Sequence, residues 1–232
     1  VELLRAIWES RARHTGGLDV VNYLFPFHML AAGPIQSWDD YRKDLELPLA
    51  DPTFDEMLEG MEVLAAGLVK KFVLAQAVQV VFLSGFQTHG LRLFLEIQAH
   101  YLWIFLDFSA YSDIAFGAGK LMGIATPQNF NHPFKARNII DFWERWHMSL
   151  SGFVRRNLFT PTLLHGMRRF PALTPLVAGS LAFLVAFVAC GLWHGISYRF
   201  LIWGFIHAVA VILCYTYSQL LQRRLRRQGV SA

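Results

Sequence analysis

The chain has 232 residues and a formal net charge of +4, with 54% hydrophobic and 16% charged residues. When glycine is counted and tyrosine is omitted, its apolar share is about 58%, against about 45–50% for soluble domains. This excess indicates an integral membrane protein and argues against a soluble domain. The Lys and Arg residues gather between apolar runs, a pattern that marks the cytoplasmic side of a membrane rather than a nucleic-acid surface. The sequence has no glycine-rich phosphate loop and no Gly-x-Ser-x-Gly elbow, so P-loop nucleotide chemistry and serine hydrolysis find no support.

The N-terminal quarter alternates polar and apolar stretches. Residues 1–17 predict an amphipathic surface helix or the end of a loop. Residues 18–35 are apolar but contain Pro26 and Pro34. Because proline removes a backbone donor, this stretch predicts a short interrupted or re-entrant segment. Residues 36–60 carry eight acidic residues and predict a polar loop.

Two longer stretches follow. Residues 61–86 predict a helix that begins at an interface and dips inward, although Lys70 and Lys71 are costly in mid-span unless they snorkel or face protein. Residues 91–124 are too polar for a lipid-facing span and predict helices packed inside a bundle. Gly117 and Gly119 would permit close helix contact there.

Two acids of this stretch, Asp107 and Asp113, are candidate ion-pair partners of Lys120 or Arg145. Structural pairing is favoured for them over catalysis, because a buried charge needs a partner.

A charged helix is predicted from about residue 139 to about residue 157. Asn138 has the spacing of an N-cap residue, and Asp141 is favourably placed in the first helical turn. Apolar residues at steps of three and four form one stripe, and His147 lies on its border. The helix is too charged to span a membrane, so it is expected along the inner interface or inside the bundle. Taken alone, His147 is more readily an interface histidine than a catalyst.

Two long uncharged runs, residues 170–198 and 200–222, dominate the C-terminal part. A membrane helix needs about 20 apolar residues, so each run is long enough to span, and together they predict a helical hairpin. His194 lies where the runs meet, between Gly191 and Gly195. Basic stretches lie on either side of the hairpin, at residues 135–169 and 223–227. If both are cytoplasmic, His194 lies toward the outer half of the membrane.

A titratable side chain at membrane depth is costly, so His194 is a candidate functional residue. Non-helical backbone is tolerated there only inside protein or beside a wet cavity, which predicts a histidine at the bottom of a protein-lined pocket. Catalysis or transport is favoured over a buried histidine bonded to a backbone carbonyl. Cys190 lies one turn earlier, but no further ligand pair completes a metal site. His207 is expected to form a hydrogen-bonding contact between helices.

Four stretches, taken in order and spacing, resemble the membrane-bound O-acyltransferase family. They are residues 27–35, 106–115, 129–134 with 141–151, and 191–195. The similarity is to a bacterial branch that contains the alginate O-acetylation protein and the teichoic acid D-alanyltransferase. In this resemblance His194 matches the near-invariant histidine of the family, and His147 matches a second position that is asparagine or histidine. The usual Arg-Asp-Tyr after the tryptophan-histidine segment is Arg155-Arg156-Asn157 here.

The resemblance implies an all-α polytopic membrane helical bundle with short interfacial and re-entrant helices. Residues 1–232 would form a single membrane domain, the C-terminal part of a longer enzyme in the bacterial inner membrane. His194 and His147 are the expected catalytic residues. The candidate substrate-binding residues are Asp107, Tyr111, Asp113, Arg145, Trp146 and Trp193.

The implied reaction is transfer of an acyl group, with acetyl favoured, to a hydroxyl of an exported polysaccharide such as alginate. His194 would act as a general base or through an acyl-histidine intermediate. Acetyl-CoA or a carrier-protein thioester would be the donor, with no permanently bound cofactor and no metal. Expected partners are membrane lipid, the polysaccharide and companion acyl-transfer proteins, and no nucleic acid. Three alternatives remain open: D-alanyl transfer to teichoic acid, a transporter, and a non-catalytic membrane scaffold.

Overall fold

The chain folds as helices joined by turns and short loops. A computed structural model describes residues 2–8, 16–46, 51–85 and 90–228, and none of these residues forms a β-strand. The predicted all-α membrane class is confirmed. Contacts divide the chain into two compact units, Val1–Phe130 and Asn131–Ala232, each with its own helix packing. A single membrane domain over residues 1–232 stays a prediction.

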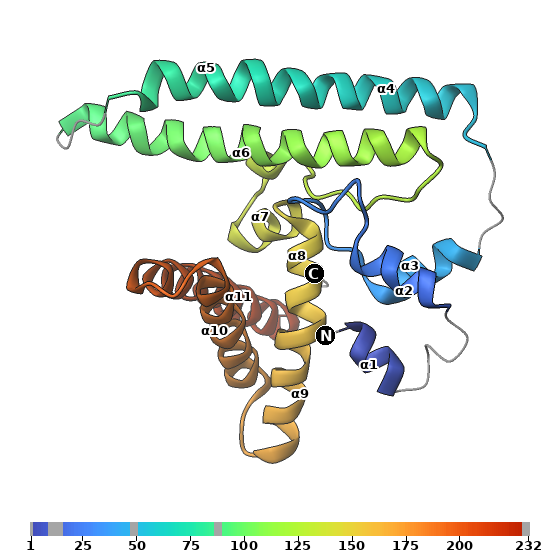
Figure 1. Ribbon diagram of the computed structural model, residues 1–232. Helices are drawn as coiled ribbons and strands as arrows, with labels where there is room; N and C mark the ends of the chain where they lie inside the picture. Colours follow the sequence, from blue (N-terminus) through green and yellow to red (C-terminus); the bar gives the residue numbers. More distant parts are fainter. Residues whose placement is uncertain (1, 9–15, 47–50, 86–89, 229–232) are drawn as a thin grey trace. The chain divides into compact units, whose positions relative to one another are not determined.

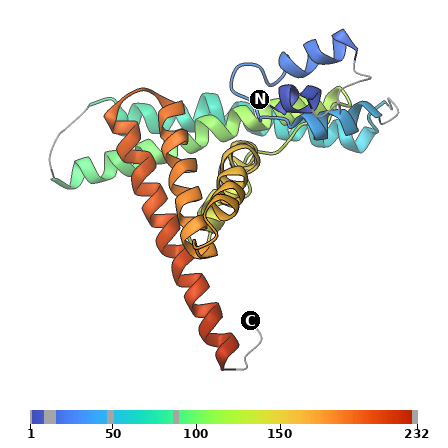
Figure 2. The ribbon, with the colours of Figure 1, turned by 90° about the horizontal axis from the view of Figure 1, so that it is seen from below.

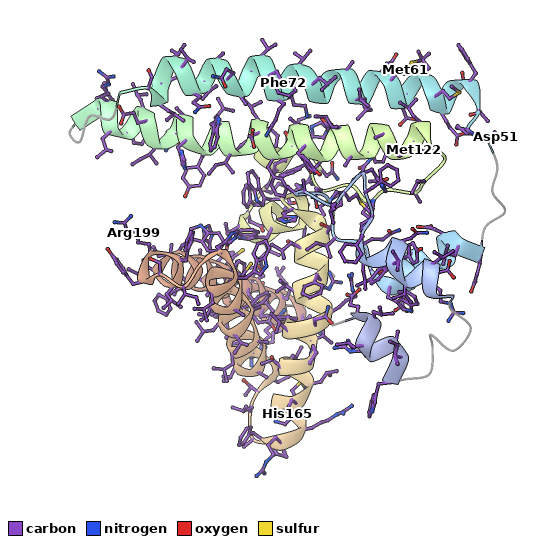
Figure 3. All side chains as sticks on the ribbon, viewed as in Figure 1. Asp51, Met61, Phe72, Met122, His165 and Arg199 are labelled. Atoms are coloured by element: carbon purple, nitrogen blue, oxygen red, sulfur yellow. The ribbon has the colours of Figure 1, made fainter. Side chains whose placement is uncertain are left out.

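A long antiparallel helix pair dominates the first unit (Figure 1). Helix α4 (Phe54–Val69) continues through a π-helical turn into α5 (Gln76–Val78), and α6 (Gly90–Leu121) packs along it. The two backbones touch at glycines, since a Cβ on Gly117 would lie 2.6 Å from the carbonyl oxygen of Gly60. The predicted close helix contact is therefore confirmed at Gly117, but it is wrong at Gly119, which lies against Ile124 and Thr126 in the loop that follows its own helix. Figure 3 shows Met61 and Met122 at the same end of this pair.

Three ion pairs cross between these two helices. They are Lys70–Asp113, Lys71–Asp107 and Lys120–Glu59. Lys70 and Lys71 thus face protein, one of the two arrangements expected for them, and not the membrane surface. Structural pairing of Asp107 and Asp113 is therefore confirmed, but the expected partners, Lys120 or Arg145, are wrong. The antiparallel register sets the adjacent lysines opposite these acids, whereas Lys120 lies on the same helix as the acids, two turns beyond Asp113, and pairs with Glu59 instead.

Three short helices precede the long pair: α1 (Glu2–Trp8), α2 (Gly17–Leu24) and α3 (Trp38–Glu46). Helix α2 stops two residues before Pro26, and turns follow it. This bears out the prediction of a short, interrupted segment over residues 18–35. The predicted helix or loop end over residues 1–17 falls partly on α1 and partly outside the described residues.

The predicted polar loop over residues 36–60 is wrong, because it contains α3 and the first turns of α4. The hydroxyl of Ser37 accepts a hydrogen bond from the Asp40 backbone N–H at 3.1 Å and so caps the start of α3. The Trp38 side chain is buried against Leu3 and Ala6 of α1. The buried Trp38 and the Ser37 cap thus stabilise α3 in a stretch whose average composition is polar.

The second unit contains five α-helices and a short 3-10 helix, Pro133–Lys135, among its described residues. The α-helices are α7 (Ile139–Arg145), α8 (Met148–Val154), α9 (Thr160–Arg169), α10 (Pro175–His194) and α11 (Tyr198–Arg227). A π-helical turn, Arg155–Phe159, joins α8 to α9. Helices α10 and α11 lie side by side as an antiparallel hairpin (Figure 2), which confirms the predicted pair of spans. Figure 3 shows Arg199 in the first turn of α11.

Small residues let the two helices of the hairpin approach closely. A Cβ on Gly191 would lie 2.3 Å from the carbonyl oxygen of Phe200, and a Cβ on Gly204 would lie 2.5 Å from that of Phe187. Close backbone approach at small residues is the usual packing mode of membrane helices. By length and composition, α10, α11 and the helix Phe54–Leu83 are each able to cross a membrane.

Candidate active site

The start of α7 is fixed by polar contacts that the sequence predicted. The Asn138 side-chain oxygen accepts hydrogen bonds from the backbone N–H groups of Ile140 and Asp141, at 3.0 and 2.9 Å. The Asp141 carboxylate in turn accepts from the Arg137 backbone N–H at 2.9 Å and from Arg145 Nε at 2.5 Å. These two donors hold the pKa of Asp141 below its usual value. Asn138 is therefore the N-cap, as expected, and α7 starts from a rigid end.

The helix does not continue to residue 157, and that prediction is wrong. It stops at Arg145, and His147 adopts a left-handed backbone with φ 45° and ψ 55° before α8 begins at Met148. Ser151 stabilises the break, because its hydroxyl donates to the carbonyl oxygen of Trp143 at 3.0 Å. A hydroxyl bonded to the end of one helix from inside the next is a tertiary contact that periodicity does not reveal.

A left-handed backbone at a non-glycine residue costs of order 1–3 kcal/mol, and such strain clusters at active sites. His147 is also buried, with 8% of its surface exposed. Burial and, to a smaller extent, the proximity of His194 lower the pKa of His147 to about 4. The ring is therefore neutral at pH 7 and can donate or accept a hydrogen bond.

His194 is the last residue of α10, at the break where the sequence placed it. Its ring lies edge-on to Trp203 at a centroid distance of 5.1 Å and stacks on Phe200 at 5.9 Å. Both residues belong to α11, so the hairpin itself orients the imidazole. Within the second unit His194 is exposed. The residues of this unit therefore do not form the expected pocket around His194.

An aromatic cluster joins α7 to the hairpin. Trp143 contacts Trp203 at 6.0 Å and His207 at 5.2 Å, and Trp203 lies between His194 and His207. His207 also stacks on Phe187 of α10 at 6.3 Å. His207 thus contacts other helices as predicted, but these contacts are between rings, and the predicted hydrogen bond stays a prediction. Through the same cluster, the segment that carries His147 and the helix end that carries His194 belong to one packed structure.

A cavity of about 720 Å³ lies in the second unit, between the α7–α8 segment and the hairpin. Its lining is mostly aliphatic and aromatic, with Glu144 and Arg155 as the charged residues. Neither candidate histidine lines it. Their neighbours do line it: Met148 directly follows His147, and Cys190 lies one helical turn before His194.

The expected substrate-binding residues are divided between the two units. In the second unit, Trp146 stacks on Phe142 at 5.5 Å and the exposed Trp193 lies beside His194 at 4.8 Å. Arg145 is held by Asp141, as described above. In the first unit Tyr111 accepts a hydrogen bond from the Ala31 backbone N–H at 3.2 Å.

The other two expected substrate-binding residues of the first unit, Asp107 and Asp113, are the ion-pair partners of Lys71 and Lys70. Their roles, and those of Tyr111, Arg145, Trp146 and Trp193, stay predictions.

A sequence model of the membrane-bound O-acyltransferase (MBOAT) family matches residues 4–229. This match covers nearly the whole chain and includes both candidate histidines. The chain belongs to the MBOAT family. The predicted resemblance is thereby confirmed.

Curated relatives of this MBOAT chain modify several kinds of polymer. It is 29% identical over 202 residues to the teichoic acid D-alanyltransferase of Bacillus subtilis (strain 168), covering 85% of this chain and 51% of that protein. It is 31% identical to the peptidoglycan O-acetyltransferase of Helicobacter pylori, covering 87% and 38%. It is 32% identical to the "Probable alginate O-acetylase AlgI" of Pseudomonas fluorescens, covering 83% and 38%. The chain thus spans about half or less of the length of these relatives.

Two features of the site were missed from the sequence. The left-handed turn at His147 has no signal in hydrophobic periodicity, although histidine is among the residues that tolerate this conformation. The aromatic contacts of Trp143 and Trp203 were also missed, because they depend on how α7 packs against the hairpin. Their spacing from the histidines, four residues before His147 and nine after His194, was the only available signal.

Proposed function

We propose that this chain is part of an enzyme that transfers an acyl group, with acetyl as the first candidate, from a thioester donor to a hydroxyl of an exported polysaccharide such as alginate. One observation carries the proposal. Within a chain of the MBOAT family, a strained, buried His147 and a helix-terminal His194 lie near enough that one lowers the pKa of the other. Strained and perturbed titratable groups gather at functional sites.

In the proposed reaction His194 is the general base. Its imidazole accepts the proton of the acceptor hydroxyl while that oxygen attacks the thioester carbonyl carbon. The carbon–sulfur bond then breaks, and the departing thiolate takes the proton from the imidazolium. The products are an ester and a free thiol. Proton transfer by a positioned side chain contributes typically 10²–10⁴-fold to a rate.

His147 would contact or orient the acyl donor. A neutral ring held in one backbone conformation can hydrogen-bond the donor without bringing an unpaired charge into a buried site. The donor is proposed to be acetyl-CoA or a carrier-protein thioester, used as a co-substrate, and the reaction needs no metal. Four cations are candidates for its phosphates: Lys135, Arg137, Arg155 and Arg156.

The proposed setting is the bacterial inner membrane, with the full enzyme crossing it several times. Three helices able to span support this setting, and so does the family to which the chain belongs. The proposed partners are membrane lipid, the polysaccharide acceptor and companion acyl-transfer proteins, and nucleic acid is not among them.

Transfer of D-alanine to teichoic acid is the second candidate function. Its support is the similarity to the Bacillus subtilis teichoic acid D-alanyltransferase over 85% of this chain. The two functions differ in the acyl group that labels the polymer. Supplying the full-length enzyme with isotopically labelled acetyl or D-alanyl donor, and measuring which label reaches the polymer, distinguishes them.

The first test is His194→Ala in the full-length enzyme. Acyl transfer is expected to fall by a factor on the order of 10² or more. Membrane insertion should be retained, because the spanning helices are stabilised by their apolar faces and their internal backbone hydrogen bonds. The assay is polymer acylation in a strain that lacks the native gene, with protein level checked in the membrane fraction. His147→Ala is expected to act chiefly on the dependence of rate on donor concentration.

His165→Ala is the matched control. This histidine is exposed in α9 (Figure 3), outside the proposed machinery, and its loss should leave transfer unchanged. A well-inserted His194→Ala protein with near-normal acylation would contradict the catalytic assignment and favour a scaffold.

A further inference from the structure

Arginine is the only charged residue type in the last part of the chain. Residues 146–232 contain nine Arg residues and no Asp, Glu or Lys, and all 17 acidic residues precede them. Six of the nine occupy the last turns of α9 and α11, and we call them the arginine cluster: Arg168, Arg169, Arg223, Arg224, Arg226 and Arg227. No acidic side chain of this part of the chain can neutralise them, so their counter-charge has to come from elsewhere.

Both parts of the arginine cluster lie at the same end of the hairpin. A Cβ on Gly179 would meet the Tyr215 hydroxyl at 2.9 Å, so these two residues stand at one level of α10 and α11. From that level α10 leads back one turn to its start at Pro175, and α11 leads on about two turns to Arg223. A short connection joins Arg169, at the end of α9, to Pro175. Figure 2 shows α11 continuing past the start of α10.

The arginine cluster is exposed and unneutralised within the described part of the chain. All six residues are exposed, and none of them belongs to an ion pair between described residues. One guanidinium group, that of Arg169, lies 5.7 Å from the centre of the Phe170 ring. Like charges held close together repel one another, so an anion that binds among them is attracted by several cations at once.

Apolar side chains are exposed directly beside these arginines. On α11, the exposed residues Leu220 and Leu221 precede Arg223. On α9, the exposed Met167 precedes Arg168. Basic and apolar side chains that meet at the end of a spanning helix lie at the boundary between hydrocarbon and headgroups. A phospholipid offers both apolar surface and negative charge at that boundary, whereas a water-soluble acidic protein would leave the apolar side chains uncovered.

The use of arginine points to phosphate as the bound group. A guanidinium group can donate two parallel hydrogen bonds to phosphate oxygens, and an ammonium group cannot. The orientation of membrane helices depends on Lys and Arg alike, so topology alone does not require arginine at all six positions. The ammonium of a zwitterionic headgroup would also find no carboxylate side chain among residues 146–232. The arginine cluster therefore suits a headgroup that carries a phosphate and a net negative charge.

We propose that the arginine cluster binds the phosphate headgroups of anionic phospholipids, with guanidinium groups of α9 and α11 donating to the phosphate oxygens. The acyl chains of the same lipids would cover the exposed apolar residues beside the cluster. This inference gives a chemical class to the lipid that surrounds the enzyme. It rests on the membrane setting proposed above and not on catalysis by His194, so the two can fail separately.

The test compares an anionic and a zwitterionic lipid, dioctanoyl phosphatidylglycerol and dioctanoyl phosphatidylcholine. Their dissociation constants are measured on the full-length protein in a non-ionic detergent, by mass spectrometry of the intact complexes. The unchanged protein is expected to bind the anionic lipid about 5-fold or more tightly, because a single basic residue near a headgroup contributes about that factor. Replacing the four α11 members of the cluster together by Gln should abolish this preference.

Single variants provide a matched control. Arg224→Gln is expected to weaken phosphatidylglycerol binding by about 5-fold. Arg199→Gln, at the opposite end of the same helix and equally exposed, should leave it unchanged. Equal effects of the two substitutions would show a general attraction to positive charge and would overturn the proposal. Tryptophan fluorescence on the same samples checks that each variant is folded.

A charge-conserving variant tests the role of the guanidinium group. Replacing the four α11 members of the cluster by Lys keeps the charge and the topology signal but removes the two-pronged donor. Phosphatidylglycerol binding is expected to weaken by about 3-fold or more, while phosphatidylcholine binding stays unchanged. A Lys variant that binds like the unchanged protein would contradict recognition of phosphate by arginine.

The remaining outcomes distinguish a lipid from other anions. Glycerophosphoglycerol, the headgroup without its chains, should bind about 10-fold or more weakly than phosphatidylglycerol, because it covers no apolar surface. Equal binding of the two would show a general phosphate site and overturn the assignment to lipid. The proposal also fails if the unchanged protein binds both lipids equally, or if the preference survives the four Gln substitutions. An acidic protein held by these arginines without any lipid preference would likewise replace it.

Discussion

Gly191 lies at one of the closest contacts of α10 with α11, one turn before His194, and Gly191→Ala tests how tightly the hairpin determines the site. The added Cβ would stand 2.3 Å from the carbonyl oxygen of Phe200. An ordinary contact begins at about 3.4 Å, so the helices must separate by about 1 Å. The obstacle is backbone, and it cannot rotate away as a side chain would.

The size of the effect follows from two opposing terms. Overpacking a close contact costs typically about 1–3 kcal/mol. Replacing a helical glycine by alanine returns up to about 1 kcal/mol of helix propensity. Gly166→Ala, in the open part of α9, gains the second term without the first. Gly191→Ala is therefore expected to be about 1–3 kcal/mol less stable than Gly166→Ala.

The assay is reversible unfolding of the purified full-length enzyme in mixed micelles, followed by tryptophan fluorescence. Acyl transfer is measured on the same samples, and Gly191→Ala should lose activity because Phe200 and Trp203 orient the His194 ring. Equal stability of the Gly191→Ala and Gly166→Ala proteins would refute the reasoning, since it would mean that the helices separate at no cost.

Three further outcomes are expected. Lys71→Met should cost about 1–3 kcal/mol by leaving Asp107 without its partner, and adding Asp107→Leu should recover most of this loss; a recovery below 0.5 kcal/mol in a double-mutant cycle would contradict the pairing. The pKa of His147 is about 4 in the folded protein and near 6.5 in the unfolded chain. Its contribution to the free energy of unfolding is therefore complete above pH 6.5 and falls by up to about 3 kcal/mol as the pH drops toward 4. His147→Asn should flatten this fall when the free energy of unfolding is measured against pH. Cysteines at Arg168 and Arg226 should react with impermeant reagents only from the cytoplasmic side, and periplasmic labelling at either would reject the proposed topology.

The helices that the sequence predicted best are those whose stability is local or determined by the membrane. The two uncharged runs had to become α10 and α11, because a bilayer leaves backbone groups no other way to be satisfied. The Asn138 cap was predictable for a similar reason, since it needs only the next three residues. Both predictions depend on interactions within one segment.

The failures all depend on contacts between segments. The helix α3 forms because Trp38 meets residues of α1, more than thirty positions earlier. The partners of Asp107 and Asp113 follow from the register of two helices, which composition does not determine. The exposure of His194 in its unit likewise depends on where α11 places its aromatic rings.

The left-handed turn at His147 also limits which residues can occupy that position. Only glycine and, to a lesser degree, asparagine, aspartate and histidine adopt this conformation readily, and β-branched or bulky residues are outliers there. Of these, aspartate would bring a charge into a buried site and glycine would offer no side chain for hydrogen bonding. Asparagine and histidine remain, the same two residues that the resemblance assigned to this position. The left-handed backbone at position 147 therefore restricts which side chains can act there, whatever substrate is bound.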